Sequence, residues 1–265
     1  MNIKTIVKVM NFHALLRVDR ASREAEQYAM LGRDIVRIMD LIQNNRNLIL
    51  DRRTLSAPSN APRLRIFIGS DLGFCGAVNA SVNAMLDAEN GTNTVIIVGR
   101  KIHAPANAAL CLSREEFEPR YGEIEAIIAN GIHRHQFSGV DICYDDYIDI
   151  SHIEPICKTV FPIELERDKY ETYTDDFSIE GGDANTIMEE LMITYISYEV
   201  KIAAINSFAS ENVIRQATTN ESLKKIDELE TEELWHRRKL LTQAAARKSI
   251  DSYIKTKWSG SRRDS

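Results

Sequence analysis

The feature that most constrains this chain is a long stretch without a helix breaker. Residues 183–259 contain neither glycine nor proline. A helix over such a stretch would be roughly 115 Å long at about 1.5 Å per residue, well beyond the helices of ordinary globular domains. The other end is similar, because Gly32 is the only glycine before the first proline, Pro58. We therefore expect a long helix at each end of the chain.

Both helical stretches carry an apolar seam with heptad spacing. The seam of the first stretch steps alternately by four and three positions, through Ala14, Val18, Ala21, Ala25, Tyr28, Gly32, Ile35, Met39 and Ile42. The seam of the second stretch runs through Leu191, Tyr195, Tyr198, Ile202, Ile205 and Ala209, and then in steps of four to Val213 and Ala217. Two such seams at opposite ends predict an intramolecular antiparallel coiled coil. Two amphipathic helices on an ordinary core are the alternative.

The middle of the chain alternates short apolar runs with helical stretches. We expect strands at residues 64–68, 94–98, 140–144 and 159–165, and helices at residues 79–88 and 123–130. The continuous apolar run at 94–98 is typical of a parallel sheet. Pro162 indicates an edge strand or a bulge. Residues 166–182, rich in acids and tyrosines, are expected to form a loop.

This pattern predicts an α/β fold with a small Rossmann-like domain attached to a long antiparallel coiled coil. The expected boundaries are 1–56 for the N-terminal coiled-coil helix and 57–182 for the Rossmann-like domain. Residues 183–265 form the long C-terminal helix with a basic tail.

Charge is distributed unevenly along a soluble chain. Charged residues make up 27% of the sequence, the mean hydropathy is -0.27, and no run of eighteen apolar residues is present. Residues 1–53 carry a net charge of +4 and residues 236–265 one of +7, so that the middle carries -17. Basic ends without interleaved aromatic residues favour a partner with acidic surfaces over a nucleic acid.

The four cysteines are widely scattered and form no CxxC pair. Reduced thiols in a reducing compartment are the simplest interpretation. A metal site built from His133, His135 and Cys143 is conceivable, but a polar surface turn explains the two histidines better. We expect no bound metal.

The stretch IFIGSDLGFCGAVN, residues 66–79, has the strand, glycine-rich turn and helix order of a phosphate-binding loop. A Walker loop needs GxxxxGK[ST], yet no lysine occurs in residues 66–98. Gly69, Gly73 and Gly76 are wrongly spaced for a dinucleotide fingerprint. Asp71 is unsuited to phosphate and suited to capping amides, and Cys75 has no neighbouring base to make it a nucleophile. We predict a structural loop, with no catalytic and no cofactor-binding residue.

The same loop carries a family resemblance. It resembles the S-D-R-G-L-C-G-G-L-N signature of the gamma subunit of F-type ATP synthases. The matching positions are Ser70, Asp71, Gly73, Cys75, Gly76 and Asn79. In the last helix, residues 217–220 (ATTN) are similar to the family's A-A-T-D-N segment, and residues 208–211 (FASE) to its L-A-S-E segment. The likeness covers most of the chain.

The resemblance implies a rotor subunit. In this family the two terminal helices stand inside a ring of alternating alpha and beta subunits, while the Rossmann-like domain faces the epsilon subunit and the c-ring. The gamma subunit has no catalytic residue or cofactor, binds no nucleic acid and has no transmembrane segment. Its place would be peripheral, at the cytoplasmic face of a bacterial inner membrane or on the matrix side of an organelle. Arg237, Arg238 and Thr242 fall in the segment that contacts the alpha/beta ring, with Arg238 where the family often has glutamine.

The chain also departs from the family pattern. Leu72 replaces the arginine of the signature, and the first helix begins roughly four turns later than usual. These departures indicate a diverged or alternative form. A Rossmann-like nucleotide-binding enzyme with helical extensions, and a coiled-coil adaptor of another assembly, are the alternative functions.

Overall fold

The computed structural model describes residues 3–45, 47–51, 57–58, 60–71, 73, 75–89, 91–149, 152–163, 165, 177–179 and 182–260. The chain divides into two compact units. Asn11–Thr218 form the larger unit, which contains the sheet. The smaller unit contains the first residues of the chain, up to Met10, and the residues from Thr219 onward.

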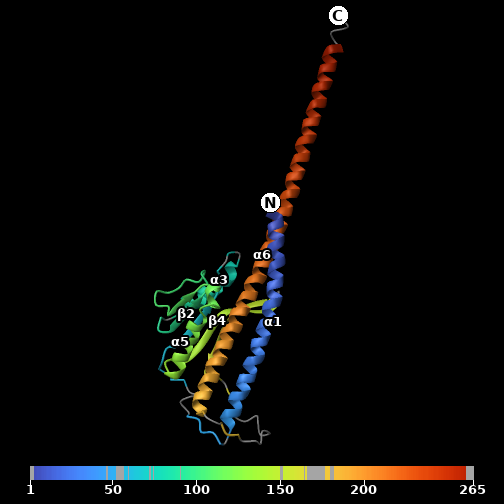
Figure 1. Cartoon of the computed structure of the whole chain (residues 1–265). Coiled ribbons are helices and arrows are strands. Elements are labelled where there is room, and N and C mark those ends of the chain that lie inside the picture. The colour runs from blue at the N-terminus through green and yellow to red at the C-terminus, as the bar shows by residue number, and fades with distance from the viewer. Residues whose placement is uncertain are drawn as a thin grey trace. The chain divides into compact units, whose positions relative to one another are not determined.

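The two long helices predicted from the sequence are present. Helix α1 spans Ile3–Asn44 and helix α6 spans Ala184–Gly260. Within the larger unit they lie side by side, as Figure 1 shows in blue and orange. The rings of Tyr28 and Tyr198 are 5.6 Å apart, and a Cβ atom at Gly32 would lie 3.9 Å from the ring of Tyr195. Because the position on α6 falls as the position on α1 rises, the pair is antiparallel and the prediction is confirmed.

The predicted seam of α1 is the face that the helix buries. Its best-buried members expose 9% or less of their surface and are Ala14, Val18, Ala21, Ile35, Met39 and Ile42. The opposing seam of α6, from Leu191 to Ile205, is mostly half-buried. Other residues of α6 are fully buried in the same core as the sheet, among them Met188, Ile196 and Val200. Helix α6 therefore packs against α1 with one face and against the sheet with another.

The sheet has five strands in the order β3-β2-β1-β4-β5. They are β1 (Arg63–Ile68), β2 (Thr94–Val98), β3 (Leu110–Leu112), β4 (Gly139–Asp149) and β5 (His152–Phe161). The first four are parallel, and β5 pairs antiparallel with β4 at one edge. This is the α/β arrangement that alternating strands and helices predict.

Helices cover the two faces of the sheet. Helix α3 (Gly76–Asp87) packs on one face, where Val82 and Leu86 meet Phe67 and Ile97. The larger core on the other face joins strand residues to α1, α6 and α5 (Tyr121–His133). The short helix α4 (Arg114–Phe117) begins with a capping box between Ser113 and Glu116.

One strand prediction is wrong in its extent. The strand expected at residues 159–165 is β5, which begins at His152 and ends at Phe161, while Pro162 follows it after a cis peptide bond. Most of β5 is exposed, so it has no continuous apolar run to reveal it. Strand β3 and helix α4 were not predicted either. Most of the loop expected at residues 166–182 lies outside the described residues.

The interpretation of all four cysteines as reduced thiols is also wrong. Cys143 and Cys157 lie directly opposite each other on β4 and β5 and are joined by a disulfide bond. Their separation in the sequence hides this proximity, which the β4–β5 hairpin creates. Cys75 and Cys111 are free, the first buried and the second exposed. Across the described part of the chain, no three histidine, cysteine or acidic side chains are grouped to hold a metal.

Candidate functional site where the sheet meets the long helix

The loop after β1 is closed by the side chain of Asn79. Its Oδ1 accepts a hydrogen bond from the backbone N–H of Ser70 at 3.0 Å, and its Nδ2 donates to Ser70 Oγ at 2.8 Å. A weaker bond from Nδ2 reaches the carbonyl oxygen of Cys75 at 3.4 Å. Ser70 is fully buried. The first loop amide therefore points at a protein side chain and is not offered to a phosphate.

Asp71 holds two other segments to this loop. Its Oδ1 accepts from the backbone N–H of Arg100 at 2.8 Å, and its Oδ2 accepts from that of Arg114 at 3.0 Å. The first segment follows β2 and the second begins α4. The carboxylate satisfies backbone donors that would otherwise need other partners. Asp71 thus ties the ends of two strands and the start of a helix together.

Cys75 lies between the loop and α6. Its Sγ donates to the carbonyl oxygen of Gly73 at 3.2 Å and lies 3.6 Å from a guanidinium nitrogen of Arg215 on α6. Arg215 also forms a buried ion pair with Glu211, one turn earlier. Burial raises the pKa of the Cys75 thiol, and the charge of Glu211 adds to this rise. The thiol is therefore neutral at ordinary pH and unsuited to nucleophilic attack.

Among the other signature residues, Gly76 begins helix α3, and both Gly73 and Gly76 have open space where a Cβ would be. The close approach is made instead by Gly69 and Gly99. Gly99 has a φ of 121°, and a Cβ there would lie 2.8 Å from the backbone carbon of Gly69. The ends of β1 and β2 therefore come this close because Gly99 lacks a side chain, whereas a Cβ at Gly69 would meet the side chain of Ile102.

Arg114 connects this junction to the main chain of α6. Its guanidinium donates to the carbonyl oxygen of Ala204 at 2.8 Å and lies 4.6 Å from the ring centre of Phe208. Burial lowers the pKa of this guanidinium, against the opposing effect of Glu211 and Asp71. Arg114 is the first residue of the short helix α4, and the capping box fixes its backbone there.

A second cation bridges three helices nearby. The ammonium of Lys201 on α6 lies 4.6 Å from the ring centre of Tyr121 on α5 and 5.6 Å from that of Tyr28 on α1. The hydroxyl of Tyr121 donates to the carbonyl oxygen of Ser197 at 2.6 Å. Burial raises the pKa of Tyr121 well above its ordinary value. The phenol is therefore protonated at neutral pH and can donate this bond.

Strand β4 contributes a buried acid to the junction. The carboxylate of Asp145 accepts from Ser81 Oγ at 2.8 Å and 2.9 Å, and its carbonyl oxygen accepts from Ser210 Oγ at 2.9 Å. Burial raises the pKa of Asp145 to about 6 from the ordinary 3.8, while the bond from Ser81 opposes the rise. The folded chain holds this proton more tightly than the unfolded chain. The resulting stabilisation is therefore complete below about pH 4 and is lost as the pH rises through about 6.

We call this set of contacts the shaft junction. It comprises the loop residues Ser70, Asp71, Cys75 and Asn79, the side chains of Arg114 and Asp145, and residues 204–215 of α6. The loop residues were singled out in the sequence, and so were residues 208–211 and the seam positions of α6. Arg114 and Asp145 were missed, although the sequence S-R-E-E around Arg114 is a capping-box signal. Asp145 stands beside Asp146 in a strand with several acids, so the sequence does not mark it as buried.

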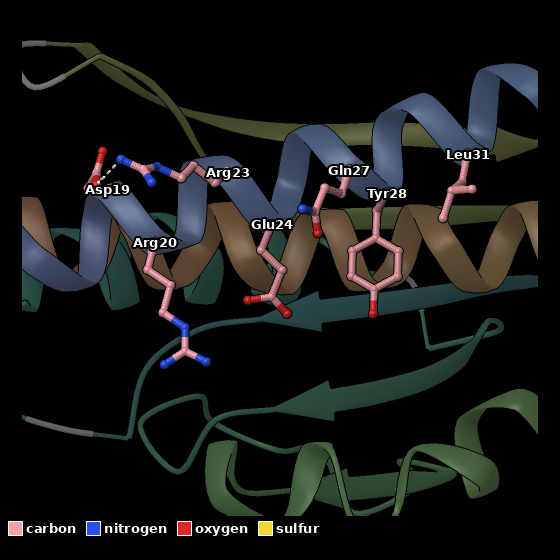
Figure 2. Close-up of a pocket in the computed structure, with 7 residues that line it drawn as sticks. All are labelled: Asp19, Arg20, Arg23, Glu24, Gln27, Tyr28 and Leu31. Carbon is pink, nitrogen blue, oxygen red and sulfur yellow. Dashed lines mark ion pairs between the residues drawn. The ribbon is translucent and has the colours of Figure 1, made fainter.

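A separate groove of about 570 Å³ lies along α1, lined by Asp19, Arg20, Arg23, Glu24, Gln27, Tyr28 and Leu31. Figure 2 shows Asp19 paired with Arg23, while Arg20, Glu24 and Tyr28 project from one side of α1. The Asp19–Arg23 distance is 2.9 Å. Every lining residue comes from one helix, and both signs of charge are present. No residue of the glycine loop takes part, so this groove does not restore a nucleotide site.

The three residues predicted to contact a ring lie on α6 in the smaller unit. Arg237, Arg238 and Thr242 are all exposed, and the hydroxyl of Thr242 donates to the carbonyl oxygen of Arg238 at 2.9 Å. Arg237 also lines a groove on the surface of the helix together with Leu229 and Leu240. These residues are distant in sequence from the signature loop and belong to a different compact unit. In the part of the chain that the structure describes, no helix has the length and hydropathy to cross a membrane.

Comparison with known proteins agrees with this picture. A family model described as ATP synthase matches residues 1–240. The ATP synthase gamma chain of Clostridium novyi is 24% identical over an alignment of 242 residues, which covers 86% of this chain and 83% of that protein. The gamma chain of Mycobacterium leprae is 25% identical over 250 residues, with the same two shares.

Solved structures agree at the level of the fold. A chain from the central stalk and c-ring of the Tetrahymena thermophila mitochondrial ATP synthase has a TM-score of 0.56 at 17% identity, covering 82% of this chain and 99% of that one. A chain from the Euglena gracilis mitochondrial enzyme has a TM-score of 0.50 at 16% identity, covering 89% of this chain and 93% of that one. The matched family model, the named relatives and the junction between sheet and shaft lead to one conclusion: the chain belongs to the ATP synthase family and is a gamma chain, the central stalk of the F-type enzyme.

Proposed function

We propose that this protein is the rotating shaft that couples ion flow through a membrane sector to ATP synthesis or hydrolysis in a ring of alpha and beta subunits. The chemistry takes place in the beta subunits, and this chain contributes no catalytic residue. Helices α1 (Ile3–Asn44) and α6 (Ala184–Gly260) form the shaft, and the domain between them faces the epsilon subunit and the c-ring. The protein is held at the membrane by these partners.

The observation that carries this proposal is the exposure of α6 beyond residue 226. Every residue from 227 to 254 is exposed, and large apolar side chains are frequent among them. At about 100° per residue, Leu229 and Leu240 lie on one side of the helix, Leu234 and Leu241 about a third of a turn round, and Trp235 on a third side. A single partner helix would cover only one of these sides. Apolar side chains on all sides favour a sleeve that encloses the helix.

The exposed segment of α6 has an acidic stretch followed by a basic one, which favours a partner with the opposite charge facing each stretch. Residues 227–233 are rich in acids, whereas residues 236–248 contain Arg237, Arg238, Lys239, Arg247 and Lys248. Arg237, Arg238 and Thr242 lie at the start of the basic band, and we assign them to contacts with the alpha/beta ring. Acidic lever surfaces on the ring would complement this band and fix the axial position of the shaft.

The shaft junction supports the same function from the other end. Torque passes between a membrane rotor and a catalytic ring only if the sheet and α6 move as one body. The junction joins them by hydrogen bonds to backbone carbonyls and by buried charges, in addition to apolar packing. Such directional contacts resist turning of the helix against the sheet, which apolar contacts alone do not.

Reconstitution tests the proposal. Alpha and beta subunits from the same organism are purified with and without this chain, and the assembled ring is assayed for ATP hydrolysis. We expect stable co-purification and faster hydrolysis when the chain is present. The double variant Arg237→Ala/Thr242→Ala should reduce that stimulation, whereas Arg120→Ala, an exposed site on the sheet domain, should not. A ring that never binds the chain and hydrolyses ATP equally well without it would refute the proposal.

A further inference from the structure

Between residues 203 and 210, the surface of α6 that is buried against the rest of the larger unit includes several small side chains. Ala203, Ala204, Ser207 and Ser210 expose 1% of their surface or less. Small residues let the helix approach the sheet closely, but they project little into the neighbouring surface. Close packing of this kind resists separation more than it resists rotation of the helix about its own axis.

Arg114 adds a long side chain across this stretch, beside the hydrogen bonds of Asn206 to Asp146 and of Ser210 to the carbonyl oxygen of Asp145. Its guanidinium donates to the carbonyl oxygen of Ala204 at 2.8 Å and lies 4.6 Å from the ring centre of Phe208. Ala204 and Phe208 are one helical turn apart and thus share a side of α6. The guanidinium therefore makes a charged hydrogen bond and a cation–π contact one turn apart on α6. Together the two contacts fix the position of α6 along its axis and its rotation about that axis.

The backbone of Arg114 is itself held by the loop that follows β1. The backbone N–H of Arg114 donates to Asp71, whose second carboxylate oxygen accepts from the backbone N–H of Arg100. Asp71 lies three residues after Ile68, the last residue of β1. A force on the sheet therefore reaches α6 through a short path of Asp71, Arg114 and the carbonyl of Ala204.

We propose that Arg114 is the positioning residue that locks the rotation of α6 to the sheet domain, with Asp71 of the signature loop holding it in place. The inference rests on the proposed function. It predicts that loss of Arg114 lets the shaft slip under load, so that ATP is hydrolysed in the ring with less ion transport. Hydrolysis itself depends on the α6 segment inside the ring and should continue.

The test measures coupling in the complete reconstituted complex. Arg114→Met keeps the apolar stem and removes charge and donors, Arg114→Lys keeps the charge, and Phe208→Leu removes the aromatic face from α6. Arg120→Met is the matched control, because Arg120 follows the same short helix and pairs only with the neighbouring Glu116 and Glu123 among the described residues. ATP-driven uptake of the coupling ion into vesicles is divided by the rate of ATP hydrolysis.

We expect this ratio to fall roughly twofold or more in Arg114→Met, because two directional contacts are lost together. Arg114→Lys and Phe208→Leu should give intermediate ratios, and Arg120→Met the wild-type ratio. Wild-type ratios in Arg114→Met and Phe208→Leu would overturn the inference. If Arg114→Met does not assemble, a wild-type ratio in Phe208→Leu overturns it and a lowered ratio supports it. Failure of the unsubstituted chain to support ion uptake would instead count against the proposed function.

Discussion

Replacing Asn79 by alanine is expected to weaken the fold at the loop that begins the shaft junction. The substitution removes the acceptor of the Ser70 N–H at 3.0 Å and the donor to Ser70 Oγ at 2.8 Å. Ser70 is fully buried, so water does not readily replace either partner. The end of β1 and the first turn of α3 lose the side chain that joins them.

The magnitude follows from these contacts. A buried N–H that loses its partner costs about 1–3 kcal/mol, and the second hydrogen bond contributes about 1 kcal/mol. Alanine has the better helix propensity, which returns about 0.5 kcal/mol. The net loss is about 2–3 kcal/mol in the free energy of unfolding of the sheet domain.

Native-state hydrogen exchange of the β1 and β2 amides is the suitable assay, because it reports on the sheet separately from the long helices. A loss of 2–3 kcal/mol should lower protection roughly 30- to 150-fold, since each 1.36 kcal/mol is about a factor of ten.

Asn83→Ala is the matched control one turn further along α3. Asn83 accepts from the backbone N–H of His103 at 2.8 Å and donates to the carbonyl oxygen of Lys101 at 3.3 Å, both in an exposed turn. Water can replace these partners, so we expect a loss below about 1 kcal/mol. Equal effects of the two substitutions, or a loss below 1 kcal/mol for Asn79→Ala, would refute the reasoning.

Three further predictions concern stability. Asp145→Asn should raise the free energy of unfolding at pH 7–8 by about 2–3 kcal/mol, because a buried charge is removed. It should also remove the dependence on pH that Asp145 gives the free energy of unfolding between about pH 4 and 6. Urea unfolding at several pH values checks this, and no gain at pH 8 would contradict it. Gly99→Ala should cost more than about 2 kcal/mol because of its positive φ and its close approach to the neighbouring strand end, whereas Gly122→Ala, with open space around it, should be nearly neutral; thermal melts that show equal effects would contradict this. Reduction of Cys143–Cys157, which are 14 residues apart, should lower stability by about 3 kcal/mol, and Cys157→Ser should abolish the response to dithiothreitol; an unchanged melting temperature of the unsubstituted protein on reduction would contradict this.

Sequence reasoning reached the long helices because their signals are local. The absence of glycine and proline from 183–259 and the step of four and three through Ala14 and Ile42 predict helices and their buried faces directly. The buried strands at 64–68 and 94–98 were equally clear, because both faces of a parallel strand are covered and the two runs are largely apolar apart from Arg65.

The hairpin partner β5 was harder to predict for the opposite reason. Its residues are mostly exposed and mixed in character, so their strand conformation depends on pairing with β4. The disulfide between Cys143 and Cys157 follows from that pairing and has no local signal. Spacing along the sequence carries little information about contacts that a hairpin creates.

The candidate site was predictable only in part. The loop motif located Asp71 and Asn79, and its chemistry excluded a phosphate site. The partners on the other side of the junction, Arg114, Asp145 and Arg215, come from three different elements. A single side chain that reaches across the fold leaves no periodic pattern, so its role is visible only once the elements are packed together.

The central claim is that this chain rotates as the shaft of an alpha/beta ring, and direct observation of rotation tests it best. Cys111 on β3 is an exposed free thiol, whereas Cys75 is buried and the other two cysteines are joined, so a bead can be attached at Cys111 of the native chain. With the ring fixed to a surface, addition of ATP should make the bead turn continuously in one direction. A bead that stays still while the same assembled ring hydrolyses ATP would contradict the account.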